Sequence, residues 1–250
     1  MTFSTLNESS LHKTLKIMYS QIYEGQTEVE SEGHVYDIVT KKGNIIEIQT
    51  KNLSKLLPKI KDAISKGHNV KVVHPNILNT KIELYDEENN LLSSRKSPKK
   101  GCIYDIFKEL TGLYPILLDK RFSLEIIQIS MIEKRLRTKE AEQSKNKKRR
   151  FKKNWQKEDK RLSEIHGTII FNSAEQYLAL LPSSLPQEFT AKNLAYELKG
   201  IKELPERISK DSHLIIWVLE KMQLLERCGT KNRSRLYRIV KTNNDINTTV

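Results

Sequence analysis

Apolar residues recur at two different periods in the early part of the chain. Over residues 8–23 they follow helical spacing and predict an amphipathic helix, whose apolar stripe holds Leu11, Leu15, Met18 and Ile22. Two strand patterns follow, His34 to Val39 and the isoleucine-rich Asn44 to Thr50. The pattern therefore predicts a helix followed by a β-hairpin.

The loop of this hairpin determines which residues face each other. Lys41-Lys42-Gly43 fits a three-residue loop in which Gly43 takes the left-handed position. Counting back from the loop sets Asp37 opposite Glu47, and such opposed residues have Cβ atoms about 4.5–5.5 Å apart. Gln49 follows Glu47 at the two-residue strand period and shares its face. A two-residue loop would separate the two carboxylates.

A helix is predicted over residues 53–66, with a kink or a later start at Pro58. A strand over residues 70–73 follows and ends at His74-Pro75. Strand, helix and strand at this spacing predict a right-handed crossover and a parallel pair.

The middle of the chain is expected to hold a hairpin formed by residues 81–86 and 91–94. More helix is expected within 103–136, together with a largely apolar strand from Phe122 to Ile129. The highly charged, low-complexity segment 139–161 is interpreted as a linker or an exposed helix.

The C-terminal part follows a different plan. Ser173 to Gln176 match a capping box, Thr190 caps a second helix, and Ser209 starts a third. A basic hairpin over 225–240 follows, with its turn at 229–232. Three helices and a hairpin in this order are typical of a winged helix-turn-helix.

We therefore expect an α/β protein of two domains within the 250 residues. The predicted parts are an α/β domain at 1–136, a basic linker at 137–168, a winged-helix domain at 169–243 and a disordered tail at 244–250.

The formal net charge of +13 gathers in three segments. Residues 145–161 hold ten basic and two acidic residues, 95–100 hold four basic residues, and 227–238 hold five. Together these segments exceed the whole net charge, a pattern typical of contact surfaces for phosphates. The alternative is a solvated linker with chance clustering.

Other protein classes fit less well. Cys102 and Cys228 lie far apart in the sequence, which excludes a disulfide scaffold and the usual zinc clusters. The chain has no long apolar run, its N-terminus lacks the pattern of a signal peptide, and no phosphate-binding loop motif is present. We expect a cytoplasmic protein, nucleoid-associated if the source is bacterial, with no membrane partner.

The facing carboxylates Asp37 and Glu47 are the strongest chemical signal. Mg²⁺ prefers hard oxygen ligands and keeps several waters, so two carboxylates on a hairpin can hold it. Such an ion polarises a phosphodiester and activates an attacking water.

These residues resemble the PD-(D/E)xK nuclease superfamily, whose core is αβββαβ, with an acid on the second strand and E-x-K on the third. Asp37, and ten positions later Glu47-Ile48-Gln49, match that layout. The resemblance implies Mg²⁺ (or Mn²⁺) held by Asp37 and Glu47, support from Glu8 on the first helix, and a catalytic set completed by Gln49. Gln49 departs from the usual lysine and can only hydrogen-bond. Lys51 could stand in for it if the strand continues.

The chain is also similar to an uncharacterised group of bacterial proteins. These combine an E-I-Q-T core, an R-K-S-P-basic-basic-Gly element and a C-terminal winged helix. The corresponding residues here are Glu47–Thr50, Arg95–Gly101 and 173–240.

Basic side chains of the three segments and of the third C-terminal helix are the candidate nucleic-acid contacts. They are Arg95, Lys96, Lys99, Lys100, Arg149, Arg150, Lys210, His213, Lys231, Arg233 and Arg235. Phe151 and Trp155 could stack on bases or anchor the linker, and winged helices also mediate protein contacts. We expect a protein that binds double-stranded DNA, can form a homodimer and acts as a Mg²⁺-dependent endonuclease. The alternative is a non-catalytic DNA-binding protein or regulator with a degenerate nuclease core.

Overall fold

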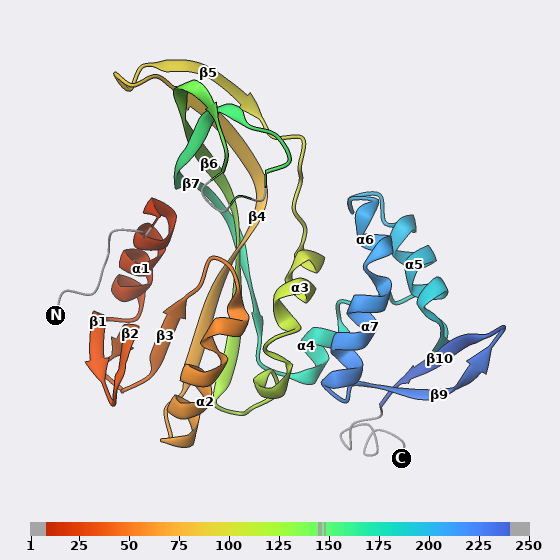
Figure 1. Cartoon of the computed structure of the whole chain (residues 1–250). Coiled ribbons are helices and arrows are strands. Elements are labelled where there is room, and N and C mark those ends of the chain that lie inside the picture. The colour runs from red at the N-terminus through yellow and green to blue at the C-terminus, as the bar shows by residue number, and fades with distance from the viewer. Residues whose placement is uncertain (1–8, 145–146, 148, 241–250) are drawn as a thin grey trace. The chain divides into compact units, whose positions relative to one another are not determined.

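The computed structural model describes residues 9–144, 147 and 149–240 (Figure 1). Contacts divide the chain into two compact units. Unit 1 comprises Met1–Thr50, Lys71–Gly101 and Glu125–Ile169, and unit 2 comprises Lys51–Val70, Cys102–Leu124 and Ile170–Val250. The boundaries predicted from the sequence for the domains stay a prediction.

Unit 1 is built on a large sheet and one covering helix. The elements are α1 (Ser10–Ile22), β1 (Gly25–Ser31), β2 (His34–Thr40), β3 (Ile45–Ile48), β4 (Val70–Tyr85), β5 (Leu91–Lys96), β6 (Phe122–Glu142) and β7 (Lys153–Phe171). The sheet order is β1-β2-β3-β4-β6-β7, and β5 pairs with β4. The predicted pairing of 81–86 with 91–94 is confirmed by Lys81↔Lys96 and Leu84↔Ser93.

The predicted first helix packs on this sheet as α1. Leu11 and Leu15 are fully buried in one cluster with sheet residues such as Ile38 and Ile48. Ile22, the last member of the expected stripe, is instead 61% exposed at the end of the helix. Ser9 is the N-cap, and its side chain accepts from His12 N–H.

The predicted register of the hairpin is confirmed. Val39 pairs with Ile45, and Ile38 with Ile46. The loop is closed by Thr40 N–H, which donates to the Asn44 carbonyl at 2.9 Å, and Gly43 has the left-handed φ of +75°. The sequence pattern missed β1, which pairs with β2.

The segment expected to be a linker or an exposed helix instead carries the end of β6 and the start of β7. Side chains of these two neighbouring strands form ion pairs: Lys134 lies 3.0 Å from Glu158, and Lys157 lies 2.5 Å from Glu133. Two charges of the run, Lys157 and Glu158, are therefore engaged in cross-strand ion pairs, which a reading along the sequence cannot detect. Residues 145, 146 and 148 lie outside the described part.

Strand β4 also differs from the prediction, because it continues through His74-Pro75 to Tyr85. Proline lacks an N–H group, but its fixed φ is compatible with an extended chain. His74 and Pro75 are both buried within this strand.

Unit 2 holds short helices and a small sheet. Its elements are the 3₁₀ turns η2 (Leu53–Leu56), η3 (Ile103–Ile106) and η4 (Tyr114–Ile116), the helices α2 (Leu57–Ser65), α3 (Phe107–Leu110), α4 (Ala174–Leu178), α5 (Ala191–Gly200), α6 (Arg207–Lys210) and α7 (Ser212–Lys221), and the strands β8 (Glu188–Phe189), β9 (Leu225–Lys231) and β10 (Ser234–Ile239). The small sheet has the order β8-β10-β9. Pro58 lies in the first turn of α2, so the later helix start, one of the two alternatives predicted for this proline, is confirmed.

The capping box predicted at Ser173 and the helix cap predicted at Thr190 are confirmed. The predicted helix start at Ser209 is wrong, because Ser209 lies inside α6 and its hydroxyl donates to the Glu206 carbonyl. The predicted turn at 229–232 is also wrong. The turn residues are Asn232 and Arg233, which have φ of +49° and +62° and form a two-residue hairpin loop.

The chain is thus a mixed α/β protein with a large mixed sheet and several helices, as the coarse prediction stated. Among the described residues, no helix is both long and apolar enough to cross a membrane. The predicted tail, 244–250, lies outside the described residues.

Candidate functional site

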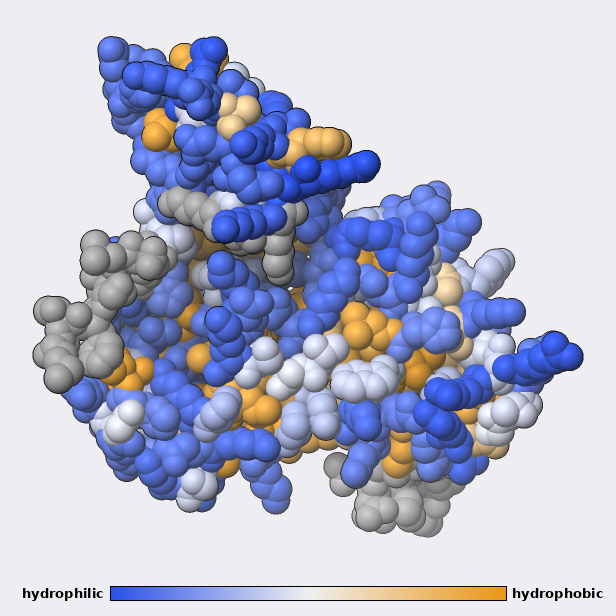
Figure 2. Space-filling model, viewed as in Figure 1, coloured by the Kyte–Doolittle hydropathy of each residue, from blue (hydrophilic) through white to orange (hydrophobic). Residues whose placement is uncertain are grey.

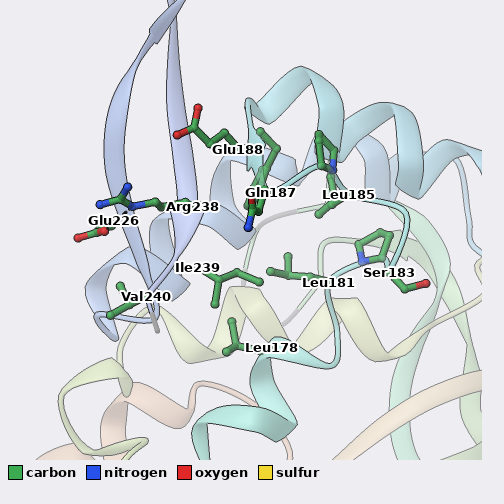
Figure 3. Close-up of a pocket in the computed structure, with 13 residues that line it drawn as sticks. Leu178, Leu181, Ser183, Leu185, Gln187, Glu188, Glu226, Arg238, Ile239 and Val240 are labelled. Carbon is green, nitrogen blue, oxygen red and sulfur yellow. Dashed lines mark hydrogen bonds and ion pairs between the residues drawn. The ribbon is translucent and has the colours of Figure 1, made fainter. Parts of the chain in front are cut away.

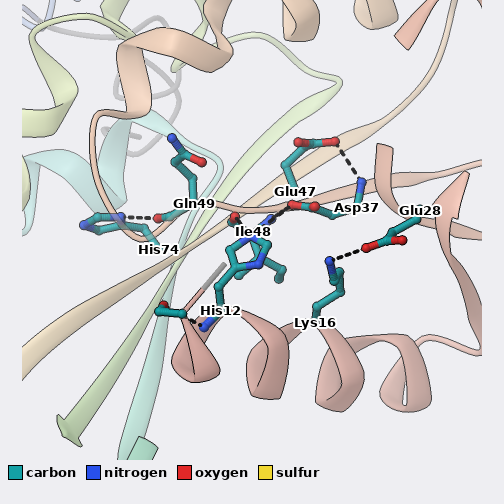
Figure 4. Close-up of polar contacts among 9 residues, drawn as sticks. His12, Lys16, Glu28, Asp37, Glu47, Ile48, Gln49 and His74 are labelled. Atoms are coloured by element: carbon teal, nitrogen blue, oxygen red, sulfur yellow. Dashed lines mark hydrogen bonds and ion pairs between the residues drawn. The ribbon is translucent and has the colours of Figure 1, made fainter. Parts of the chain in front are cut away.

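The strongest polar constellation of unit 1 lies where β2 meets β3 (Figure 4). The register of the hairpin sets Asp37 opposite Glu47. Asp37 N–H donates to Glu47 Oε1 at 3.3 Å, and the Glu47 residue is only 3% exposed. The sequence therefore positions two acidic residues side by side at the end of this strand pair, one of them inside the protein.

The Asp37 carboxylate is held from two sides. Ile48 N–H donates to Oδ2 at 2.8 Å, and His12 Nε2 lies 3.6 Å from the same oxygen. Burial alone raises the pKa of this carboxyl, but the contacts with His12 and Ile48 N–H and the charge of Lys16 outweigh burial, so the pKa is lowered. Asp37 is therefore ionised at neutral pH.

His12 and Lys16, both on α1, are the residues that the sequence analysis did not assign to this site. His12 Nε2 lies 2.7 Å from the Ile48 carbonyl and therefore carries a proton that it donates there. Lys16 is 7% exposed and its ammonium lies 2.9 Å from Glu28 Oε1. Their spacing of four residues puts both on one helix face, a signal that was present in the sequence.

Gln49 lies just past the end of β3. Its N–H donates to the Val73 carbonyl at 3.0 Å, and its own carbonyl lies 2.7 Å from His74 Nδ1. In Figure 4 the side chains of Gln49 and Glu47 extend to the side of β3 away from α1. Lys51 does not extend this face as the strand pattern suggested, because β3 ends at Ile48.

Two carboxylates of hard oxygen character match the ligand type that Mg²⁺ prefers. Glu8, the third predicted acid, lies outside the described residues. In the described part of the chain, no three His, Cys, Asp or Glu side chains gather into a metal-binding group. Asp37 and Glu47 meet here through the Asp37 N–H and Glu47 Oε1, whereas the Asp37 carboxylate itself contacts Ile48 N–H and His12.

Most of the predicted nucleic-acid contacts are exposed: Arg95, Lys96, Lys99, Lys100, Arg150, Lys210, His213, Lys231, Arg233 and Arg235. Figure 2 shows the hydrophilic surface over β5. Arg149 differs, since its guanidinium stacks on the Trp155 ring at 4.1 Å and donates to the carbonyls of Glu142 and Trp155. Arg135 also lies on this ring, at 3.6 Å. These contacts favour the anchoring role of Trp155 over stacking on bases.

Unit 2 contains a pocket (Figure 3). Its lining is mainly apolar and includes Leu181, Phe189 and Ile239. Its basic residue, Arg238, is paired with Glu226 at 2.6 Å. This pocket therefore offers little attraction for an anion.

Comparison with known proteins assigns a family to this chain. Residues 9–172, which include α1, the β2–β3 pair and the basic β5 strand, match the family described as "Domain of unknown function (DUF8091)". The chain belongs to this family. A DUF8091 relative from Treponema pallidum (strain Nichols), described as an uncharacterized protein, is 31% identical over 201 residues, or 80% of this chain and 76% of the relative. No solved structure matches this DUF8091 chain.

Proposed function

We propose that this DUF8091 protein binds DNA and hydrolyses phosphodiester bonds with Mg²⁺ or Mn²⁺ held by Asp37 and Glu47. The observation that carries the proposal is the register that sets these two residues opposite each other. The order of helix α1, strands β1 to β3, helix α2 and strand β4 supports it, because it follows the αβββαβ order of the PD-(D/E)xK core.

The chain's own residues suit this chemistry. When bound, the ion supplies an activated water and polarises the phosphodiester. Asp37 is kept ionised and is oriented by Ile48 N–H and His12. The superfamily motif has a lysine where this chain has Gln49. Lys16 supplies a positive charge near Asp37 from α1 instead. Gln49 would orient the water through a hydrogen bond. The supporting role of Glu8 stays a prediction, because Glu8 lies outside the described residues.

Binding to duplex DNA is supported by the C-terminal residues. Helices α5 and α7 are followed by the hairpin β9–β10, in a sheet ordered β8-β10-β9. This order of elements supports the proposal of a winged helix. Lys231, at the end of β9, and Arg233, in the turn, are exposed at the tip of the hairpin. A wing of this charge would contact the phosphate backbone. The homodimer and the cytoplasmic, nucleoid-associated location stay predictions.

A cleavage assay tests the proposal. The protein is incubated with supercoiled, linear and single-stranded DNA in Mg²⁺, Mn²⁺ or EDTA. We expect metal-dependent cleavage that Asp37→Asn and Glu47→Gln each reduce by two orders of magnitude or more, whereas the exposed Glu30→Gln on β1 retains it. Equal cleavage by all four proteins would indicate a contaminant and refute the assignment.

A second function, DNA binding without cleavage, is favoured by one specific feature. Gln49 replaces the charged residue of the superfamily motif. This function predicts tight, salt-sensitive binding of DNA that needs no metal and yields no cleaved product under any condition of the assay.

A further inference from the structure

Unit 1 contains a groove of about 800 Å³ that is separate from the Asp37–Glu47 pair. It is lined by residues 79–81 within β4, the end of β5, the turn that follows β5, and residues from β6 and β7. Its basic residues are Lys81, Arg95, Lys96 and Lys100, and Glu164 is the one carboxylate among its described lining residues. The groove therefore carries a net positive charge.

Two of these cations are placed against each other. Lys81 on β4 is the direct cross-strand partner of Lys96 on β5, and like charges at such positions destabilise a sheet. Glu83 relieves this only in part. It lies 2.9 Å from Lys81 but also 3.0 Å from Arg161, so its charge is shared. An anion in the groove would remove the remaining repulsion.

The turn that carries Lys100 is held in place at both ends. Ser97 N–H donates to the Thr80 carbonyl at 2.8 Å, and Gly101 N–H donates to the Leu78 carbonyl at 2.9 Å. The backbones approach so closely that a Cβ at Gly101 would lie 2.0 Å from the Ile77 carbonyl oxygen. Glycine is thus required there, and the basic turn is organised before any ligand arrives.

The remaining polar groups of the groove suit phosphate and sugar oxygens. Ser130 Oγ lies 2.7 Å from His166 Nε2, and Asn79 Nδ2 lies 3.4 Å from the same hydroxyl. Of the described residues that line the groove, none is Phe, Tyr or Trp, so it has no platform on which bases would stack. Its chemistry is that of contacts to a nucleic-acid backbone.

We propose that this groove binds the phosphodiester backbone of duplex DNA, independently of sequence, and holds the DNA while the Asp37–Glu47 pair acts. The inference rests on DNA being the partner in the proposed function. It does not depend on cleavage, because backbone binding needs no metal.

The test is fluorescence anisotropy with labelled duplexes of two unrelated sequences, in EDTA, over a series of salt concentrations. The variant Arg95→Gln/Lys96→Gln/Lys100→Gln removes three groove charges. The slope of log K against log salt is negative, and each lost phosphate contact reduces its magnitude by roughly 0.9. We therefore expect the magnitude to decrease by up to about 2.7 for both duplexes. Lys55→Gln/Lys61→Gln/Lys120→Gln removes the same charge from exposed positions of unit 2 and is the matched control.

Gly101→Ala changes no charge but displaces the basic turn, and we expect several-fold weaker binding with an unchanged circular dichroism spectrum. Binding of wild-type strength by the groove variant, or equal losses in the groove variant and the control, would overturn the proposal. Glu30→Gln, which lies on β1 outside both the groove and the carboxylate pair, should bind as wild type does. A protein that binds through the groove but never cleaves would refute only the nuclease assignment.

Discussion

The Lys71–Glu125 pair offers a sharp test of the energetics of unit 1. Lys71 Nζ lies 2.8 Å from Glu125 Oε2 and 2.6 Å from the Tyr23 hydroxyl, and the Tyr19 hydroxyl donates to Glu125 Oε1. The side chain of Glu125 is 7% exposed and that of Lys71 is 19% exposed. Lys71→Met keeps the aliphatic stem of the lysine but leaves a buried carboxylate without its cation.

Breaking a buried pair by removing one partner costs about 3–5 kcal/mol, because the other charge stays uncompensated. Tyr19 remains as a donor and Lys71 is partly solvated, so the lower end, about 3 kcal/mol, applies. In a chain of this size that corresponds to a fall in Tm of roughly 6–12 °C. The double variant Lys71→Met/Glu125→Gln removes the uncompensated charge and should recover at least about 1 kcal/mol of that loss.

Urea unfolding followed by circular dichroism measures these differences. Lys41→Met is the matched control, because Lys41 pairs with Glu24 at 2.6 Å while both side chains are more than two-thirds exposed, and such surface pairs contribute about 0–1 kcal/mol. If Lys71→Met destabilised the protein no more than Lys41→Met, the account of a buried charge network would be wrong.

Other substitutions probe the hairpin and the β6–β7 ladder. Gly43→Ala should cost about 1–2 kcal/mol in urea unfolding, since φ is +75° there, whereas Gly43→Asn should cost less. A loss below about 0.3 kcal/mol for alanine would contradict the left-handed loop. Burial opposes ionisation of Glu133, but hydrogen bonds from Lys157 and Arg135 outweigh burial and lower its pKa. Its contribution is therefore present above the pKa of the unfolded state and is lost as pH falls through the lower folded-state pKa. Glu133→Gln should lower the urea midpoint at pH 7 and have little effect near pH 2; an equal effect at both would contradict this charge assignment.

The elements of the N-terminal half could be predicted where a single local rule applied. The spacing of Leu11 and Leu15 indicated α1, and Gly43 determined the loop and hence the register of Asp37 with Glu47. β1 was missed because its sequence, Gly25 to Ser31, is polar and mostly exposed, so it lacks the alternation that marks a strand.

Only part of the candidate site could be predicted from the sequence by such local rules. A hairpin places its two strands through local geometry, and so Asp37 and Glu47 could be paired from the sequence. The spacing of His12 and Lys16 sets them on one face of α1, but it is the packing of α1 on the sheet that brings this face to Asp37. Packing between distant elements leaves no local signal. The role of Trp155 could not be decided from the sequence for the same reason, because its contact with Arg135 joins residues on two different strands.

By itself, the sequence determined the mixed α/β class, the register of Asp37 with Glu47 and the concentration of positive charge, because each depends on composition or on neighbours within a few residues. The tertiary structure alone decided which charges are neutralised. It pairs Lys157 with Glu133 and Glu158 with Lys134 across the β6–β7 ladder, yet sets Lys81 opposite Lys96 beside a basic turn that is hydrogen-bonded at both ends. The sequence does not define the partner of a charged residue until strands that lie far apart in the chain are aligned. The reason is that electrostatic energy depends on the distance between charges and on their burial, not on their positions along the chain.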